Sequence, residues 1–231
     1  MIVTLINDWM YEGTSPYVYI GSAAAITRGV TFEEFLKWPE ERQKAIVREC
    51  YDSGHWSVFE FATFDIQVEG VSRVFETQAV RSRLCSFEWE SGRHDQEYES
   101  ADIILDTAID DGVCEGIDLY HNLRFFNDIP AEDARYALPQ GVARKGRICR
   151  NFRNLMETSL IRMCSHAQKE YRDFMYAAKT CIAHVDPFLA EFLVPKCEWY
   201  GYCNEKYSCH RNNIPTRSEA MQIIGEHYER T

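Results

Sequence analysis

NFRNLMETSLIRMCSHAQKEYRDFMYAAKTCIAHV, residues 151–185, carries the strongest pattern in the chain. Its apolar side chains recur every three or four residues from Phe152 to Val185, which is the spacing of one buried helix face. Asp186 and Pro187 follow, and a proline breaks a helix because it has no backbone N–H to donate. The stretch therefore predicts one long, deeply packed helix.

The segments before this helix predict a mixture of strands and helices. Residues 62–71 alternate apolar and polar side chains, which predicts a half-buried strand. Thr31 and Glu34 have the spacing of a capping box, a pair of reciprocal hydrogen bonds at the start of a helix. Further strands are expected at residues 2–7 and around 135–148, and further helices at 40–54, 72–83 and 101–126. The predicted organisation is one mixed α and β domain with a tail from about residue 195.

The composition limits what the protein does. The chain has 231 residues, 45% of them hydrophobic, which suffices for one well-filled core. No apolar run approaches the roughly 20 residues that span a bilayer, and the N-terminus lacks the basic start of a signal peptide. A net charge of -11 disfavours nucleic acid as a partner. We therefore expect a cytoplasmic protein with no membrane or nucleic-acid partner, whose nine cysteines are free thiols.

Arginines gather in two segments of this acidic chain. Residues 81–83 read Arg-Ser-Arg and residues 91–93 read Ser-Gly-Arg, a combination of guanidinium groups, hydroxyls and flexible backbone that suits phosphate binding. Two arginines two residues apart point the same way if their segment is extended. The second segment contains no acid and six cations: Arg135, Arg144, Lys145, Arg147, Arg150 and Arg153. Both segments predict anion sites, and exposed cations paired with the chain's many acids are the alternative.

Two polar residues mark one side of the predicted long helix. Asn151 and Arg162 are eleven positions apart, so at about 100° per residue they lie within roughly 20° of each other and about 16 Å apart along the axis. Arg162 also stands in the apolar stretch LIRMC, where a guanidinium needs an anionic or hydrogen-bonding partner. Both side chains can therefore line one elongated ligand site, and a structural salt bridge of Arg162 is the alternative.

Four segments, in the same order, resemble the motifs of flavin-dependent thymidylate synthases. Residues 81–93 (RSRLCSFEWESGR) resemble the family signature R-H-R-x-x-S followed by S-x-R. Residues 54–61 (GHWSVFEF) resemble its G-H-x-S/T-x-x-E-H segment, and residues 132–139 (EDARYALP) resemble D-A-R-x-x-L-P. Residues 151–172 resemble N-x-R-x-L-x(5)-L-R followed by A-Q-x-E-I-R. The resemblance covers roughly residues 20–185.

The resemblance implies an α/β (α+β) fold: a single domain with a twisted antiparallel sheet and packed helices, including one long C-terminal helix. Residues 1–195 would form the catalytic domain and residues 196–231 a cysteine- and aromatic-rich tail. The implied activity is that of a methyltransferase, the FAD-dependent reductive methylation of dUMP to dTMP with 5,10-methylenetetrahydrofolate and NADPH as co-substrates. The implied assembly is a homotetramer whose sites form where subunits meet.

The resemblance also implies roles for particular residues. The expected cofactor-binding residues are His55, Ser57, Glu60, Arg81, Ser82, Arg83, Asn151, Arg153 and Glu157. The expected residues for a pyrimidine deoxynucleotide monophosphate are Gln78, Arg81, Trp89, Glu90, Ser91, Gly92, Arg93, Arg135 and Arg162. Arg162 is expected to be catalytic, because a fixed cation at the N3/O4 edge of the pyrimidine stabilises charge that develops there. Ser91 is expected to contact phosphate, since no His or Lys lies close in sequence to activate it as a nucleophile.

Several motif positions depart from the family pattern. Ser82 replaces a histidine, Trp89 replaces an acid and Glu157 replaces an asparagine. These departures leave open hydroxymethylation in place of methylation, or dCMP in place of dUMP, as modified-base synthesis would require. A nucleotide- or flavin-binding protein without turnover is a third alternative, which the retained arginines disfavour.

The tail carries a second group of candidate ligands, Cys197, Cys203, Cys209 and His210. Zinc sites favour such residues but usually include two cysteines separated by two to four positions, and the tail lacks that pair. We therefore expect no metal, with a zinc site in the tail as the alternative.

Overall fold

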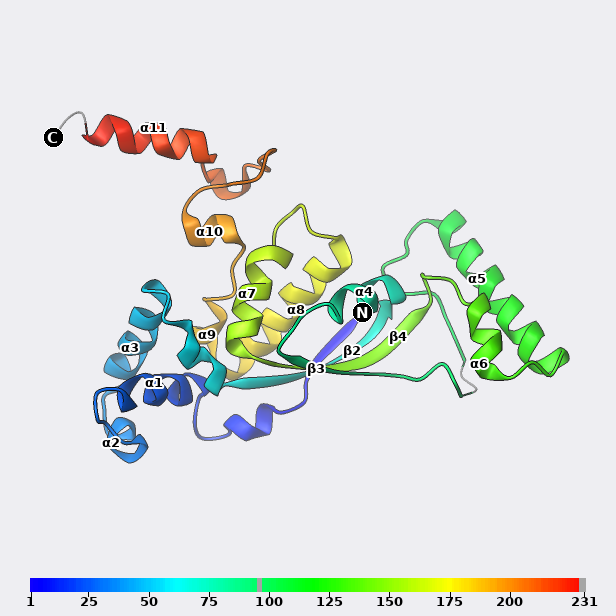
Figure 1. The fold of residues 1–231 in the computed structure, drawn as a ribbon, viewed down its shortest axis with the longest axis horizontal. Helices are drawn as coiled ribbons and strands as arrows, with labels where there is room; N and C mark the ends of the chain where they lie inside the picture. Colours follow the sequence, from blue (N-terminus) through cyan, green and yellow to red (C-terminus); the bar gives the residue numbers. More distant parts are fainter. Residues whose placement is uncertain (95–96, 229–231) are drawn as a thin grey trace. The chain divides into compact units, whose positions relative to one another are not determined.

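The computed structural model of the chain describes residues 1–94 and 97–228, and Figure 1 labels its helices and strands. The chain folds as two compact units, each built from two separate stretches of sequence. Residues 1–13 and 63–151 make the first unit, and residues 14–62 and 152–231 make the second. The sheet belongs to the first unit, and the second is helical. This combination confirms the predicted α/β class.

The first unit is built on a four-stranded antiparallel sheet in the order β1-β2-β4-β3. Its strands are β1 (Ile2–Leu5), β2 (Thr63–Ser72), β3 (Cys85–Trp89) and β4 (Ala143–Asn151). In β2 the side chains of Phe64, Ile66 and Val68 are fully buried while the residues between them are partly exposed, so the strand predicted over 62–71 is confirmed. The pairing register shifts around Gly70, whose φ of 73° suits glycine because it has no Cβ to clash.

Short helical elements complete the first unit: η1 (Asp8–Tyr11), α4 (Arg73–Ala79), α5 (Thr107–His121), the π-helical turn η3 (Asn122–Phe126), α6 (Ala131–Ala134) and η4 (Arg135–Ala137). Helix α4 begins where β2 ends, because the Ser72 hydroxyl accepts a hydrogen bond from the Phe75 backbone N–H as an N-cap. Apolar side chains of α5 pack on those of residues 134–142 in a small separate core. That packing holds the backbone that carries Arg135.

The second unit has an aromatic core. Its helices are α1 (Pro16–Ile26), α2 (Phe32–Leu36), α3 (Glu40–Asp52), η2 (Trp56–Phe61), α7 (Phe152–Arg162), α8 (Lys169–Val185), α9 (Pro187–Ala190), α10 (Lys196–Tyr200), η5 (Arg211–Asn213) and α11 (Arg217–Tyr228). Phe59, Phe152 and Phe192 are almost wholly shielded from solvent, and the rings of Tyr51 and Phe192 stack with centroids 4.4 Å apart. Within the described residues, no helix has both the length and the apolar character needed to cross a membrane.

The predicted single helix over residues 151–185 is wrong, because the stretch forms two helices, α7 and α8, with a break over 163–168. In the break, the backbone carbonyls of Ser165 and Ala167 accept hydrogen bonds from the Arg172 guanidinium at 2.8 and 3.2 Å. This side chain supplies hydrogen bonds to carbonyls in the interrupted backbone. The apolar spacing continues across the break, so periodicity alone does not reveal it.

Candidate active site

A cavity of about 660 Å³ lies in the first unit beside the end of β3. Its walls come from the start of α4, the segment after β3, the turn around residues 135–140 and strand β4. Five of the expected substrate-binding residues line it: Trp89, Glu90, Ser91, Gly92 and Arg135. The other lining residues are Arg73, Glu76, Tyr98, Tyr136, Leu138, Gln140 and Arg144. The structure thus brings the two predicted arginine-bearing segments to one cavity.

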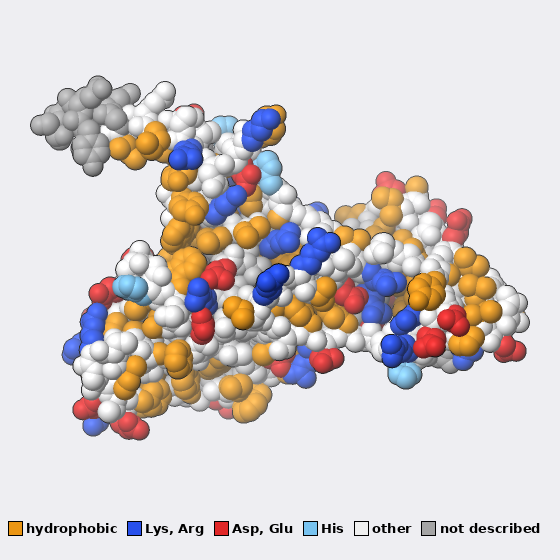
Figure 2. Space-filling model, viewed as in Figure 1, with side chains coloured by type: hydrophobic (Ala, Val, Ile, Leu, Met, Phe, Trp, Pro, Cys, Tyr) orange, Lys and Arg blue, Asp and Glu red, His pale blue; other side chains and the backbone are white. Residues whose placement is uncertain are grey.

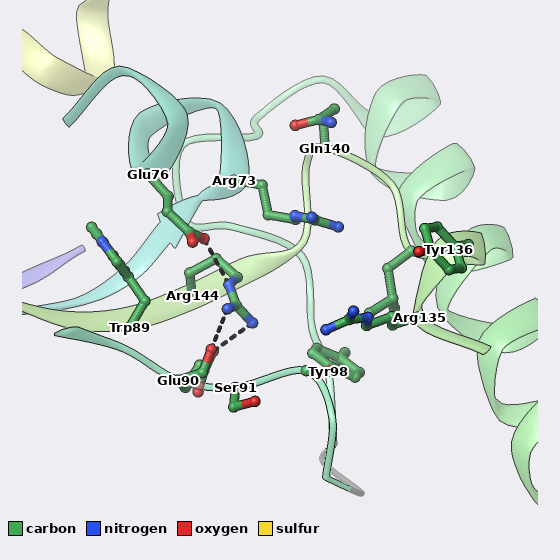
Figure 3. Close-up of a pocket in the computed structure, with 12 residues that line it drawn as sticks. Arg73, Glu76, Trp89, Glu90, Ser91, Tyr98, Arg135, Tyr136, Gln140 and Arg144 are labelled. Atoms are coloured by element: carbon green, nitrogen blue, oxygen red, sulfur yellow. Dashed lines mark hydrogen bonds and ion pairs between the residues drawn. The ribbon is translucent and has the colours of Figure 1, made fainter. Parts of the chain in front are cut away.

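Two arginines face this cavity from opposite sides. Figure 3 shows the side chains of Arg73 and Arg135 extending toward the same space. Among the described residues, neither guanidinium has a carboxylate within ion-pairing distance, although Arg135 Nε donates to the Glu132 backbone carbonyl at 2.9 Å. Two cations that face one space repel each other unless an anion binds between them. The arrangement therefore suits an anionic ligand, and the forked donors of arginine match phosphate.

The segment at Gly92 comes close to both Arg135 and Tyr98. A Cβ added at Gly92 would lie 3.4 Å from Arg135 Cδ and 3.4 Å from the Tyr98 hydroxyl oxygen, which is van der Waals contact with both. The Ser91 hydroxyl beside it accepts a hydrogen bond from the Arg93 N–H at 3.3 Å. Burial raises the pKa of the Tyr98 hydroxyl, which therefore keeps its proton at neutral pH. These residues give the cavity hydroxyl donors beside its two cations.

Arg144 of β4 fixes the backbone that leads to residues 91–92. Its side chain is 8% exposed, and its Nε donates to Glu76 Oε2 at 2.9 Å. Its Nη1 lies 3.4 Å from Glu90 Oε1, and its Nη2 donates to the Glu90 backbone carbonyl. The Glu90 carboxylate also accepts a hydrogen bond from the Lys145 N–H at 3.2 Å. Arg144 therefore pairs with both acids of the cavity wall. Three arginines and two glutamates line the cavity, so its charged residues sum to +1, and Arg73 and Arg135 have no carboxylate partner among the described residues.

The remaining expected residues of the first unit lie outside the lining of this cavity. Gln78 is on α4, and Arg93 follows Gly92 as an exposed residue. Residues 81–83 lie in the turn between α4 and β3, so the extended segment that would align the side chains of Arg81 and Arg83 is absent from this part of the structure. Both arginines are exposed to solvent.

Three of the expected cofactor residues meet in the second unit. Arg153 donates from Nη1 to Glu60 Oε1 at 2.8 Å and from Nε to Glu157 Oε1 at 2.9 Å. His55 and Ser57 are exposed at the start of η2, where His55 Nδ1 lies 3.0 Å from the Ser53 hydroxyl. The two glutamates hold the Arg153 guanidinium from two sides and so fix its position.

Asn151 and Arg162 do not share a helix face, contrary to the sequence-based expectation. Asn151 is the last residue of β4 and Arg162 is the last residue of α7, because the helix begins only at Phe152. The Arg162 guanidinium lies 4.7 Å from the centroid of the Tyr171 ring, and Tyr171 is fully buried. This cation–π contact gives the charge a fixed place at the end of α7.

Comparison with known proteins identifies the family of the chain. The family model described as Thymidylate synthase complementing protein matches residues 14–188. A flavin-dependent thymidylate synthase from Pyrococcus abyssi is 32% identical over 191 residues, which are 75% of this chain and 78% of that protein. The chain belongs to the flavin-dependent thymidylate synthase family. As a member of this family, it is an enzyme that transfers a methyl group.

Two further comparisons define how far the likeness to this family reaches. A flavin-dependent thymidylate synthase from Sulfurisphaera tokodaii is 30% identical over 167 residues, which cover 68% of this chain and 65% of that protein. The crystal structure of the flavin-dependent thymidylate synthase from Helicobacter pylori, in complex with FAD and dUMP, matches 84% of this chain and 100% of its own with a TM-score of 0.70. At 18% identity, this second likeness shows a shared fold.

The departures from the flavin-dependent thymidylate synthase motifs have local structural consequences. Trp89 packs against Gly146 of β4, where an added Cβ would come within 2.3 Å of the indole ring. The Ser82 hydroxyl accepts a 3.4 Å hydrogen bond from the buried guanidinium of Arg150. Glu157 adds the ion pair with Arg153 described above. Each replacement therefore makes a contact of its own in this member of the family.

Sequence reasoning missed seven residues that line this cavity, and Arg73, Tyr98 and Arg144 are the three that matter most for its chemistry. Arg144 was visible as part of the cationic run over residues 135–153, but its pairing with two acids was not. Arg73 follows directly after the N-cap Ser72. A cation at a junction between a strand and a helix was therefore the only feature of the sequence that could have marked Arg73 as a site residue. Tyr98 carries no local pattern that separates it from the other tyrosines of the chain.

The cysteine-bearing tail does not gather ligands for a metal in the described residues. No group of three or more His, Cys, Asp or Glu side chains in residues 1–94 and 97–228 has an arrangement that could hold a metal ion. Cys197 and Cys203 are buried, Cys209 is exposed, and all nine cysteines are free.

We expect Arg144→Met to lower the free energy of unfolding by about 2 kcal/mol, since Glu76 and Glu90 would lose the cation that compensates them. This is below the roughly 3–5 kcal/mol of a fully buried pair, because the two carboxylate side chains are 23% and 27% exposed. Urea unfolding followed by circular dichroism measures the change. Arg147→Met on the same strand is the control, because Arg147 is 52% exposed and pairs at the surface with Asp65. Equal losses in the two variants would contradict the structural role of Arg144.

Proposed function

We propose that this protein converts dUMP to dTMP by reductive methylation, with FAD as cofactor and 5,10-methylenetetrahydrofolate and NADPH as co-substrates. The observation that carries the proposal is the cavity where Arg73 and Arg135 converge beside Ser91 and Gly92, with no carboxylate of the described residues paired to either cation. Membership of the family supports it, as does the fold shared with a Helicobacter pylori enzyme solved with FAD and dUMP.

In this proposal, the phosphate of the nucleotide occupies the cavity. Arg73 and Arg135 supply forked donors, and the Ser91 hydroxyl adds another. Gly92 lets the phosphate approach the backbone closely, since no side chain intervenes there. Gln78, Arg81 and Arg93 are further proposed contacts, and Trp89 and Glu90 form the wall on which the nucleotide rests.

Arg162 is the proposed catalytic residue. The methylation of a uracil ring builds negative charge at its O4 and N3 edge, and a cation already held in place there lowers the energy of that state. The contact with buried Tyr171 supplies such fixed placement. Arg162 thereby acts by charge stabilisation, and no serine or cysteine nucleophile is required in the proposal.

The residues proposed to hold FAD form a donor set that fits an anionic dinucleotide. Exposed guanidinium groups, which bind phosphate, are supplied by Arg81 and Arg83. An exposed imidazole and an exposed hydroxyl, which can hydrogen-bond polar atoms of the flavin ring, are supplied by His55 and Ser57. Arg153 is fixed by its two glutamates, and Asn151, Ser82, Glu60 and Glu157 are the remaining proposed contacts. FAD supplies, when bound, the redox chemistry that these side chains lack.

Arg153→Ala should weaken FAD binding by about 10- to 100-fold, because a charge-assisted hydrogen bond contributes about 1.5–3 kcal/mol. Titration of the apoprotein with FAD, followed by flavin fluorescence, measures the dissociation constant. Lys169→Ala is the matched control, because it removes the exposed pair of Lys169 with Asp173 in the same unit. If Arg153→Ala bound FAD as tightly as the control, Arg153 would have no role in holding the cofactor.

We also propose that the protein acts in the cytoplasm, with residues 1–195 as the catalytic domain and 196–231 as its tail.

The proposed assembly is a homotetramer. Large apolar side chains are exposed on α5 and the segments around it, and Figure 2 shows hydrophobic side chains on the surface at that end of the first unit. They include Leu105, Ile109, Leu119, Phe125, Phe126 and Tyr136. A patch of this kind supports burial against other subunits. Light scattering of the purified protein tests the assembly, and a stable monomer would contradict it.

The proposed reaction is tested by leaving out one component at a time. The purified protein is incubated with dUMP, FAD, methylenetetrahydrofolate and NADPH, and dTMP is quantified by chromatography. We expect dTMP in the complete mixture and none when dUMP, folate or NADPH is omitted. Formation of dTMP without NADPH would contradict the proposed reductant, and dTMP without folate would contradict the proposed methyl source.

A further inference from the structure

We propose that the Tyr98 hydroxyl is a direct ligand of the substrate's phosphate group, an assignment that rests on the proposed nucleotide function. Tyr98 lines the cavity and is 9% exposed. Its hydroxyl oxygen is buried, and no hydrogen-bond partner for it exists among residues 1–94 and 97–228. A buried hydroxyl without a partner has lost its bonds to water and gained none, which is unfavourable. An acceptor atom of a bound ligand supplies the missing partner.

The position of the hydroxyl identifies which part of the ligand it meets. The Tyr98 oxygen would be 3.4 Å from a Cβ at Gly92, and Arg135 Cδ would be at the same distance from that Cβ. The hydroxyl therefore lies near Gly92 and Arg135, which are two of the residues proposed to hold the phosphate. Arg73 is close enough to act electrostatically on Tyr98. Hydroxyl and guanidinium groups thus converge on one region of the cavity.

The ring of Tyr98 is held rigidly enough to present this hydroxyl. Its ring meets that of Tyr120 edge to face, with centroids 5.0 Å apart and planes at 90°. Tyr120 is fully buried and belongs to the small apolar core formed by α5 and residues 134–142. A donor fixed before the ligand arrives loses little conformational entropy on binding, so its hydrogen bond contributes more to affinity.

A phosphate monoester suits this donor set better than a neutral ligand does. Its three terminal oxygens are acceptors only, and guanidinium groups are donors only. A protonated tyrosine hydroxyl donates one more hydrogen bond to an oxygen that the arginines leave available. Burial, the largest influence on the pKa of Tyr98, raises it and keeps the hydroxyl protonated despite the nearby cations.

The test compares Tyr98→Phe with Tyr120→Phe by calorimetric titration with dUMP and, separately, with inorganic phosphate. Both changes remove one buried hydroxyl from a ring and keep the ring, so the fold is preserved in each, which thermal unfolding verifies. We expect Tyr98→Phe to weaken dUMP binding by about 10- to 100-fold, the range for a hydrogen bond to a charged group. Tyr120→Phe, whose ring lies outside the cavity lining, is expected to change it less than twofold.

The outcomes separate this inference from the proposed function. If the wild-type protein binds dUMP and Tyr98→Phe binds it equally well, the Tyr98 assignment is overturned and the proposed function stands. If the wild-type protein binds inorganic phosphate but not dUMP, the proposed function fails, and weaker phosphate binding by Tyr98→Phe still supports the anion contact. If neither probe binds the wild-type protein, both are overturned.

Discussion

Replacing Arg135 by alanine is expected to lower kcat/KM for the nucleotide by about 100- to 1000-fold without unfolding the protein. The side chain enters the cavity opposite Arg73 and has no carboxylate partner among the described residues. Loss of a forked pair of charge-assisted hydrogen bonds removes about 3–4 kcal/mol of binding. The backbone of residues 134–142 stays in place because it is held by the apolar core with α5.

The controls for this prediction distinguish charge from geometry. Arg135→Lys keeps the charge but loses the fork, so about a tenth of the wild-type kcat/KM is expected to remain. Arg147→Ala removes a cation from the face of β4 opposite to that of Arg144, which lines the cavity. Arg147 is exposed and paired with Asp65, so this variant should leave kcat/KM within about twofold. Steady-state kinetics over a range of dUMP concentrations measure all three variants. An unchanged kcat/KM in Arg135→Ala would show that the phosphate of the nucleotide does not bind in this cavity.

Phe59→Ala is expected to lower the free energy of unfolding by about 4 kcal/mol, because truncating a buried phenylalanine leaves a cavity that its neighbours fill only in part. Phe59 is completely buried in the second unit. Its ring centroid lies 6.0 Å from those of Phe152 and Phe192 and 6.4 Å from that of Tyr51. These rings come from α3, η2, α7 and the segment after α9. Truncating Phe59 would therefore remove packing contacts among four elements of the second unit.

Phe61→Ala is the matched control, since it makes the same substitution two residues away on the same 3-10 helix. Phe61 is 67% exposed, so the variant should change stability by less than about 0.5 kcal/mol. Urea unfolding monitored by tryptophan fluorescence gives both values from the midpoints and slopes. A loss below about 1 kcal/mol in Phe59→Ala would mean that this aromatic cluster is not the core of the second unit.

Local signals in the sequence predicted local structure well. The capping box expected at Thr31 and Glu34 is present with both reciprocal hydrogen bonds, and the alternating residues of β2 pair on both sides in the centre of the sheet. The break over residues 163–168 could not be predicted in the same way. It depends on Arg172 reaching back to two carbonyls, an interaction that leaves no trace in the spacing of apolar residues.

The candidate site shows a similar division. Ser91, Gly92 and Arg135 stood out because cations and small polar residues cluster around them in the sequence. Tyr98 and Arg73 did not, since their place at the cavity depends on where α4 begins and on how α5 packs. The fixed position of Glu90 likewise requires β4 to lie beside β3, a pairing between segments more than fifty residues apart in sequence. Which residues share a cavity is thus decided by topology, and a single sequence displays topology only indirectly.

The central claim is that this protein transfers a one-carbon unit to dUMP and leaves a methyl group on it. The most direct test is the product mass after incubation with FAD, NADPH, methylenetetrahydrofolate and an equal mixture of dUMP and dCMP. We predict that dUMP gains the mass of one CH2 unit and that dCMP is unchanged. A gain of CH2O, or any gain on dCMP, would contradict the claim in favour of modified-base synthesis, and no product from a flavin-loaded protein would contradict turnover itself.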